Sequence, residues 1–361
     1  MELKKSINNI RERDYSLDFI KIIATVFIIF HHYQQVTGAY FENKINFSNG
    51  KFYFGYMVEL FFVLSGSFMY SYIEKIKTGV SFKKFYLKRL CRLFPLLTVG
   101  AISYEIFLVI YQHIYQDSWF EIAPTFWGTI ISALGIQDGW ALPNPCVNNP
   151  TWYISVLMLC YVIFYFLVYI AKRLDLKVQY LFAFMIFLGM GINTYGINLP
   201  FLNASSCRGY YAFFFGVLLA EFLEKHDIGK VDILISAIMI IVITLLIIFH
   251  YDFMASGINY IMTFMYYPAL IILCKSKIVS RVLNRKIIGK LGQISFDVFI
   301  WHNPFYLVLY ICIRVFNWNL NLNSYVTMIC YAIVCYIVGT ISYYAIERPA
   351  AKLIDKKIQE I

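Results

Sequence analysis

The sequence predicts an all-α fold, a polytopic bundle of transmembrane helices, on three observations. Of the 361 residues, 60% are hydrophobic and only 14% are charged, whereas a soluble domain has about 25% charged residues. The mean hydropathy is +0.64. Aromatic residues make up 19% of the chain, with 33 Phe and 30 Tyr, and tyrosine favours the membrane–water boundary. We therefore expect most of the chain to lie in the bilayer.

The predicted spans follow from the length that a helix needs, about 20 apolar residues, to cross the hydrocarbon layer. About ten segments meet this requirement: 16–36, 52–74, 93–115, 149–171, 178–193, 209–224, 231–250, 258–275, 290–313 and 325–346. The apolar stretch 125–136 is too short to cross easily and is expected to be re-entrant or interfacial. No internal repeat or long linker is visible, so residues 1–361 are expected to form a single domain.

The basic residues are distributed unequally between the two sides of this bundle. Of the 31 Lys and Arg residues, 26 fall in segments on the N-terminal side, half of them in 75–92 and 275–290. The loops on the opposite side hold Lys44, Lys51, Arg208 and Arg314. The positive-inside rule therefore predicts a multi-pass protein of the plasma membrane with both termini in the cytoplasm. The net charge of +10 is mostly this asymmetry, and no nucleic-acid partner is expected.

The eight cysteines show no paired spacing that indicates a zinc or redox site, so no metal is expected. Only Cys146 and Cys207 fall in outward loops, where a disulfide could persist. Two separate thiols are the favoured alternative.

Two ionisable residues lie in the first predicted span. Lys21 and His32 are eleven residues apart, which puts them on one helix face about 16 Å apart along the axis. An ionisable residue in the hydrocarbon is a functional-site candidate, and histidine can exchange a proton near neutral pH. Alternatively, Lys21 snorkels to the headgroups and His32 marks the opposite interface.

The second predicted span contains Glu59 within the sequence YMVELFFVLSGSFMY. A buried carboxylate beside a buried histidine could fix the tautomer of the imidazole and raise its basicity. Alternatively, Glu59 is protonated or caps the helix at the interface. The small residues Ser65, Gly66 and Ser67 are expected to let helices approach closely.

Residues 81–95 are predicted to form a short cytoplasmic helix that lies in the interface, with Ser81 as the N-cap. Arg89 and Arg92 are one turn apart and can present two guanidinium groups to one phosphate. The alternative is that these residues only anchor the topology.

A late span contains Asp297 and His302. A single transmembrane histidine is more often a hydrogen bonder in helix packing than a catalyst, so we expect His302 to pack. Glu347 and Arg348 lie at the cytoplasmic end of the last span.

Together these segments resemble the acyltransferase-3 family of multi-pass membrane acyltransferases. Lysine replaces the arginine that usually opens the first family motif, and glutamate replaces the usual aspartate of the second. Five motifs carry the resemblance in order: Lys21 and His32, then Glu59 through Gly66, then Arg89, Arg92 and Pro95, then Ile294 through Pro304, and finally Glu347, Arg348 and Pro349.

The resemblance implies an integral-membrane O-acyltransferase. It would move an acyl group, in the first instance acetyl, from acyl-CoA to a hydroxyl of a cell-envelope or exported saccharide. Acyl-CoA would be a donor substrate, with no cofactor permanently bound. Arg89 and Arg92, with Arg348 as a further candidate, would bind the phosphates of the donor.

The resemblance also implies roles for the intramembrane residues. His32 would be the general base or a nucleophile that carries the acyl group, and these two roles stay open. Glu59 would orient His32, and Lys21 would contact the donor or stabilise the site electrostatically. A proton-coupled transporter or lipid-linked-sugar flippase is the alternative function, although no paired halves of the kind common in transporters are visible. A structural or sensor membrane protein is a third possibility.

Overall fold

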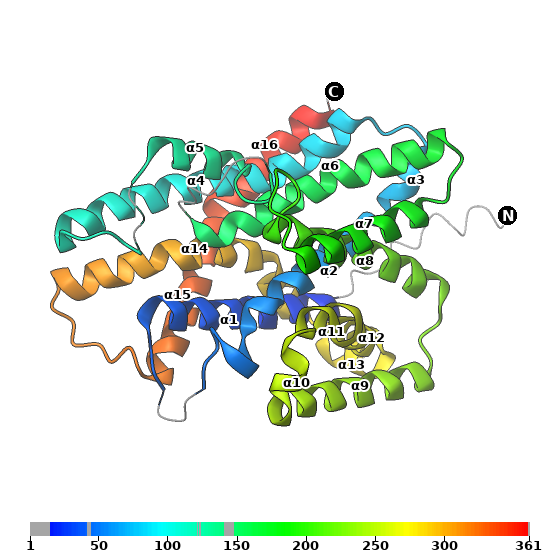
Figure 1. Cartoon of the computed structure of the whole chain (residues 1–361). Helices are drawn as coiled ribbons and strands as arrows, with labels where there is room; N and C mark the ends of the chain where they lie inside the picture. The colour runs from blue at the N-terminus through cyan, green and yellow to red at the C-terminus, as the bar shows by residue number, and fades with distance from the viewer. Residues whose placement is uncertain (1–14, 42–44, 121, 123, 141–147, 360–361) are drawn as a thin grey trace.

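The computed structural model describes residues 15–41, 45–120, 122, 124–140 and 148–359, and these residues form helices and connecting turns without a β-strand. Figure 1 shows the helices along the chain. Their bounds are α1 Ser16–Thr37, α2 Met57–Met69, α3 Tyr72–Lys77, α4 Phe82–Tyr115, α5 Phe126–Leu134, α6 Trp152–Arg173, α7 Val178–Tyr195, α8 Ala204–Lys225, α9 Lys230–Phe249, α10 Tyr251–Ala255, α11 Ile258–Ile261, α12 Tyr267–Lys275, α13 Lys277–Leu283, α14 Lys286–Val315, α15 Tyr325–Ser342 and α16 Arg348–Gln359. Two π-helical turns, Met262–Tyr266 and Tyr343–Glu347, continue α11 into α12 and α15 into α16.

The predicted all-α polytopic bundle is confirmed. Nine helical segments of the described chain are long and apolar enough to cross a membrane, and nine of the ten predicted spans coincide with them. The remaining prediction, 209–224, coincides with α8, which is 22 residues long. Polar residues in its first turns, such as Ser206 and Arg208, reduce the hydropathy of α8.

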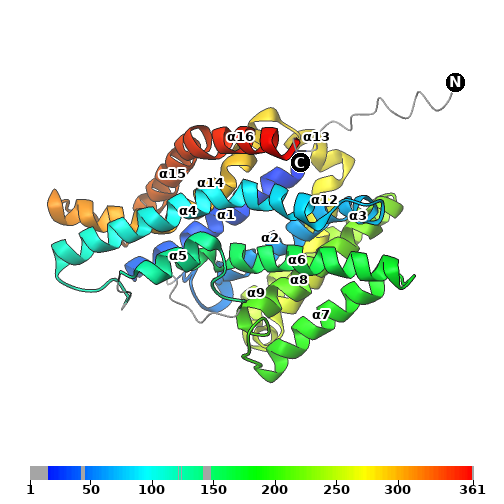
Figure 2. The ribbon, with the colours of Figure 1, turned by 90° about the horizontal axis from the view of Figure 1, so that it is seen from above.

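The helices form two packed groups that meet along α1, α4 and α6. In the first group, α14 packs against α1, α4 and α15. In the second group, α8 packs against α2, α6 and α7. The two views in Figures 1 and 2 show α14 beside α1 and α4, with α7, α8 and α9 on the other side of the molecule. A space between helices of both groups can therefore be lined by segments far apart in the sequence.

The contact between α2 and α8 depends on two glycines. A Cβ atom added to Gly66 would lie 1.9 Å from the carbonyl oxygen of Phe213, and one added to Gly216 would lie 2.1 Å from that of Val63. The hydroxyl of Ser67 also donates to the carbonyl oxygen of Gly216. The predicted role of the small residues of this span in close helix approach agrees with this geometry.

The predicted interfacial helix at 81–95 is not a separate element. Residues 82–115 form one continuous helix of 34 residues, α4, with Pro95 inside it and the Ser81 side chain as the N-cap. A proline is tolerated inside a membrane helix when neighbouring groups satisfy the freed backbone carbonyl. The basic segment is therefore the N-terminal extension of a helix that is long and apolar enough to span a membrane, which fixes its orientation relative to the bundle.

The short segment α5 has nine residues, which is too few to cross the bilayer. It packs against α4 and exposes Phe126 and Trp127. Of the two cysteines considered for a disulfide, Cys207 is buried in α8 with its thiol directed at the carbonyl oxygen of Ala204. Cys146 lies outside the described residues.

We predict that a cysteine in place of Phe120 will react with a membrane-impermeant maleimide in intact cells. Phe120 is 56% exposed and follows the C-terminal end of α4, which the positive-inside rule places outside the cell. Thr78→Cys, in the exposed turn after α3, is the matched control and should react only after permeabilisation. The opposite labelling pattern would reverse the proposed topology.

Candidate active site

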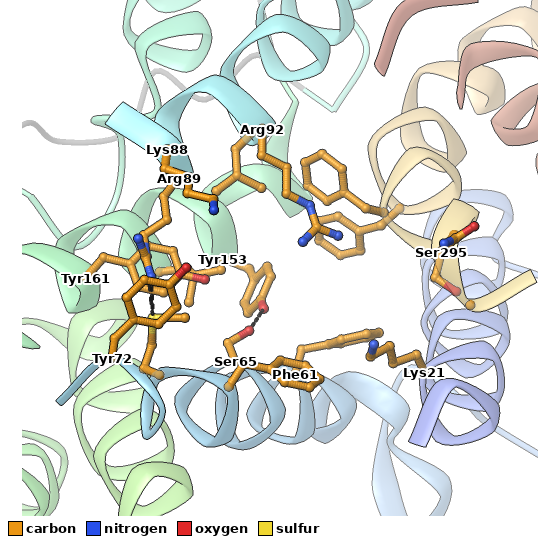
Figure 3. A pocket seen from close by; sticks show the side chains of 18 residues that line it. Lys21, Phe61, Ser65, Tyr72, Lys88, Arg89, Arg92, Tyr153, Tyr161 and Ser295 are labelled. Carbon is orange, nitrogen blue, oxygen red and sulfur yellow. Dashed lines mark hydrogen bonds between the residues drawn. The ribbon is translucent and has the colours of Figure 1, made fainter. Parts of the chain in front are cut away.

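A cavity of about 370 Å³ lies where the two groups of helices meet. Helices α1, α2, α3, α4, α6 and α14 contribute residues to its walls. Figure 3 shows the lining residues, which are Lys21, Phe61, Ser65, Phe68, Met69, Tyr72, Lys88, Arg89, Arg92, Leu93, Tyr153, Leu157, Tyr161, Gly292, Gln293, Ser295, Phe296 and Phe299. Four of these side chains are cationic, and the described lining includes no Asp or Glu. The cavity is therefore suited to an anionic ligand with apolar parts.

Arg89 is held rigidly in the wall of this cavity. Its guanidinium lies 3.7 Å from the ring centroid of Phe85 and 4.1 Å from that of Tyr72. One N–H donates to the carbonyl oxygen of Phe85 at 2.6 Å, and two others point at the sulfur of Met69. Contacts with aromatic faces and a carbonyl oxygen keep a buried guanidinium charged without a carboxylate partner. The positive charge of Arg89 therefore remains available to a ligand.

Arg92 and Lys88 lie on the same helix as Arg89, and both are exposed. In Figure 3 the side chain of Arg92 extends into the cavity from α4, and Lys21 enters from α1 on another side. The Arg89–Arg92 pair predicted from the sequence is thus brought to one cavity. Lys88 was missed by the sequence reasoning, although its position one residue before Arg89 placed it on the same turn.

Lys21 is paired with Asp18, with its amino nitrogen 2.8 Å from a carboxylate oxygen. Its nitrogen also lies 4.9 Å from the ring centroid of Phe68. The lysine side chain is 20% exposed, whereas that of Asp18 is 3% exposed. Lys21 therefore faces the cavity as a partly neutralised cation, and it does not snorkel away from the bundle.

His32 lies deeper along α1 and is not part of the cavity wall. Its imidazole lies beside that of His302 on α14, with ring centroids 5.1 Å apart. The Nδ1 atom of His32 is 3.0 Å from the side-chain oxygen of Gln35. The neighbouring His31 uses its own Nδ1 atom to bond the carbonyl oxygen of Phe47 at 3.1 Å. The structure thus brings together two histidines that are 270 positions apart in the sequence.

Three aromatic rings of the cavity wall, those of Phe61, Tyr153 and Phe299, pack together as an aromatic layer, and one of them contacts a histidine. The ring of Phe299 lines the cavity and lies 5.6 Å from the ring of His302, centroid to centroid. It also lies 5.7 Å from the ring of Tyr153 and 6.5 Å from that of Phe61. The hydroxyls of Tyr153 and Ser65 are 3.1 Å apart at the same end of the cavity. The cationic and the histidine parts of the site are therefore adjacent, with an aromatic layer between them.

The expectation that Glu59 orients His32 is wrong for this structure. Glu59 is fully buried and forms two hydrogen bonds with Arg208 of α8, at 2.6 Å and 2.7 Å. The hydroxyl of Tyr211 donates to the same carboxylate at 3.0 Å. A carboxylate taken out of water needs a cation more than it needs a neutral imidazole, because pairing offsets its desolvation. Gln35, on the same helix, occupies the position beside His32 that the sequence reasoning assigned to Glu59.

Arg208 is therefore a structural residue that the sequence reasoning misplaced. It was assigned to an outward loop, but it lies in α8, with its guanidinium 4.8 Å from the ring centroid of Trp152. The signal that could have found it is the position of Arg208 only two residues before the aromatic, apolar run that begins at Tyr210.

Arg348 does not belong to the cavity. It is exposed at the start of α16, and its guanidinium lies 5.7 Å from the ring centroid of Tyr344. The preceding Glu347 is buried near Asp297 of α14, and Asp297 accepts a hydrogen bond from Ser342 at 2.9 Å. The closing motif therefore ties the C-terminal helix to α14, and the expected role of Arg348 in donor binding has no support in this geometry.

The comparisons with known proteins agree with the resemblance. Residues 14–346 match the family model described as an acyltransferase domain, in the acyltransferase-3 family. No curated protein and no solved structure gave a match.

We predict that Arg208→Met will destabilise the protein by about 3–5 kcal/mol, because Glu59 is left buried without its cation. The double variant with Glu59→Met should recover much of this loss. Thermal unfolding in detergent will measure both. Lys77→Met is the matched control, since Lys77 pairs with the exposed Glu74 at 3.0 Å and should contribute little. Equal effects of Arg208→Met and Lys77→Met would contradict the structural role of the buried pair.

Proposed function

Because the chain belongs to the acyltransferase-3 family, we propose that it is an integral-membrane O-acyltransferase. It transfers an acyl group, acetyl in the first instance, from acyl-CoA in the cytoplasm to a hydroxyl of a cell-envelope or exported saccharide. The protein acts as a multi-pass protein of the plasma membrane with both termini in the cytoplasm. The observation that carries the proposal is the cavity lined by Lys21, Lys88, Arg89 and Arg92.

The cations of this cavity support a phosphate-bearing donor. Hydrogen bonds from guanidinium groups to phosphate oxygens are charge-assisted, and the guanidinium fork matches the geometry of a phosphate. Arg89 is fixed by its aromatic neighbours, whereas Arg92 and Lys88 are exposed and can adjust to the ligand. Repulsion from a carboxylate is not expected, because the described lining includes no Asp or Glu. Acyl-CoA supplies several phosphates and an uncharged arm that ends in the thioester.

The apolar part of the cavity supports the position of that arm. Phe61, Phe296 and Phe299 provide apolar walls beyond the cations, and the hydroxyls of Ser65 and Tyr153 are polar contacts among them. If the phosphates bind at α4, the thioester arm extends toward the aromatic layer and the histidines behind it. A water-poor channel of this kind also protects the thioester from hydrolysis.

The transfer itself needs a base for the acceptor hydroxyl. His32 is the group proposed for this role, because imidazole can take up and release a proton near neutral pH. The oxygen of the acceptor attacks the thioester carbonyl as its proton leaves, the C–S bond breaks, and the sulfur departs as the thiol. Lys21 is proposed to stabilise the negative charge of the bound donor from the α1 wall, within the limits set by its pairing with Asp18. Glu59 supports the site only through the α2–α8 contact.

We predict that Arg92→Lys will weaken acyl-CoA binding roughly 10- to 100-fold, since a hydrogen bond to a charged group contributes about 1.5–3 kcal/mol. Arg89→Lys should weaken binding as well, because lysine cannot stack between Tyr72 and Phe85 in the same way. Isothermal titration with acyl-CoA and with its dephosphorylated analogue measures the effect. Lys83→Gln, an exposed charge on α4 outside the cavity, is the control. Unchanged binding by both arginine variants would reduce the pair to a topological anchor.

We predict that His32→Ala will abolish acyl transfer while acyl-CoA still binds, because His32 lies outside the cationic cavity. His31→Ala should be milder, since His31 is rotated about 100° away on the helix and bonds the carbonyl oxygen of Phe47. Mass spectrometry of envelope glycans, for cells with each variant, reports the lost acyl group. An essential His31 with a dispensable His32 would show that the wrong neighbour was chosen.

A further inference from the structure

His302 lies behind Phe299 of the cavity wall, and its hydrogen bonding differs from the expected role as a hydrogen bonder between helices. The residue is fully buried in α14. It lies one turn beyond Phe299, the last residue of α14 that lines the cavity. Its ring is 5.6 Å from the ring of Phe299 and 5.1 Å from that of His32, measured between centroids. His302 is therefore the nearest imidazole behind the aromatic layer and the neighbour of the proposed base.

The hydrogen bonds of His302 determine its tautomer. Its Nδ1 atom lies 2.6 Å from the carbonyl oxygen of Phe299. A carbonyl oxygen can only accept, so Nδ1 carries the hydrogen, and in the neutral ring Nε2 then holds a free lone pair. The Nε2 atom is buried and has no hydrogen-bond partner in the part of the chain that the structure describes. His302 is thus a buried base whose lone pair is unoccupied.

Helix packing does not explain this arrangement. The ring packs against that of His32 on α1, but its hydrogen bond to Phe299 is made within α14 and links no second helix. Other groups already fix the backbone of α14 here: Tyr331 donates to the carbonyl oxygen of His302, and Asn148 donates to that of Ile300. The amide of Asn303 bonds the side chain of Asn148 at 3.1 Å. A buried unsatisfied nitrogen costs about 1–3 kcal/mol, and no hydrogen bond of Nε2 to the described residues offsets this cost.

We propose that His302 is a second catalytic residue, which forms a proton-transfer unit with His32. This inference rests on the proposed O-acyltransferase function. His32 takes the proton of the acceptor hydroxyl while the acceptor oxygen bonds to the carbonyl carbon of the thioester. The proton then passes from His32 to Nε2 of His302. When the C–S bond breaks, its electron pair remains on sulfur, and the sulfur takes the proton from Nε2 of His302.

The proton balance of this sequence needs no further reactant. The acceptor loses one proton, the leaving thiol gains it, and both imidazoles return to their starting states. The arrangement also suits the positions of the two substrates. Neither histidine lines the cavity, but the ring of His302 contacts that of the lining residue Phe299, and His32 contacts His302, so the sulfur of a donor in the cavity is proposed to approach His302 past Phe299.

The first test is a set of four variants: His302→Gln, His32→Gln, the double variant, and His250→Gln. His250 is exposed at the end of α9 and serves as the histidine control with unchanged activity. Acyl transfer to an envelope-glycan acceptor and acyl-CoA binding are measured for each protein purified in detergent. His302→Gln should lower kcat about 100-fold or more, in the range of general acid–base catalysis, with binding unchanged.

The double variant distinguishes a unit from two independent residues. If the histidines act together, the double variant should be no slower than the slower single variant, as is found for catalytic residues that depend on one another. A multiplied loss would show that His302 acts independently of His32 and would overturn the proposal. Wild-type kcat in His302→Gln would overturn it as well.

A second test remains decisive if His302→Gln folds poorly. His302→Ala leaves a space the size of an imidazole ring. Added imidazole should restore acyl transfer in this variant, whereas an apolar additive of the same size, such as methylcyclopentane, should not. Failure of imidazole to restore activity in a correctly folded variant, checked by its thermal unfolding, would overturn the proposal. Full activity of both His32→Gln and His302→Gln would contradict the catalytic role of His32 in the proposed function. Full activity of the His302 variants with an inactive His32→Gln would contradict this inference alone.

Discussion

The interior of a membrane bundle offers no water to a charged side chain, and this constraint decides where the charges of this protein lie. Three buried charges have an identifiable solution. Glu59 is held by Arg208 and Tyr211, and Asp18 is held by Lys21. Arg89 has no carboxylate and is surrounded by aromatic rings. Since removing one partner of a buried pair leaves an uncompensated charge, these contacts also determine which helices must stay together.

The same constraint separates structural charges from functional ones. The Glu59–Arg208 pair is internally neutral and joins α2 to α8, so it is poorly suited to bind a ligand. Arg89 and Arg92, by contrast, belong to a cavity whose described lining contains cations without an acidic residue. An excess of one charge sign is stable there only when solvent or an anion can enter. The cavity therefore has the electrostatic character of a binding site, whereas the buried pair has that of a structural contact.

The position of the site follows from the packing of two helix groups. α14 carries Ser295, Phe296 and Phe299 on the cavity wall and His302 one turn further along. α1 contributes Lys21 to the cavity and His32 to the histidine pair, because the two residues share a helix face. Both α1 and α14 therefore run from the cationic cavity, where a ligand would bind, to the histidine pair. The ring of Phe299, which packs against Phe61 and Tyr153, lies between the cavity and His302.

The sequence by itself determined the features that depend on local order along the chain. Hydropathy predicted ten spans, of which nine coincide with candidate membrane spans. The eleven-residue spacing predicted the common face of Lys21 and His32, and the one-turn spacing of Arg89 and Arg92 predicted that both could face one phosphate. Only the tertiary structure decided the partners, because contacts across helices depend on how distant segments pack. Glu59 meets Arg208 across 149 positions, and His32 meets His302 although the sequence favoured a packing role for the latter. Arg348 was expected at the donor site for its charge and motif, but the path of α15 and α16 places it elsewhere. Periodicity reports the face of a helix, and it carries no information on which other helix that face meets.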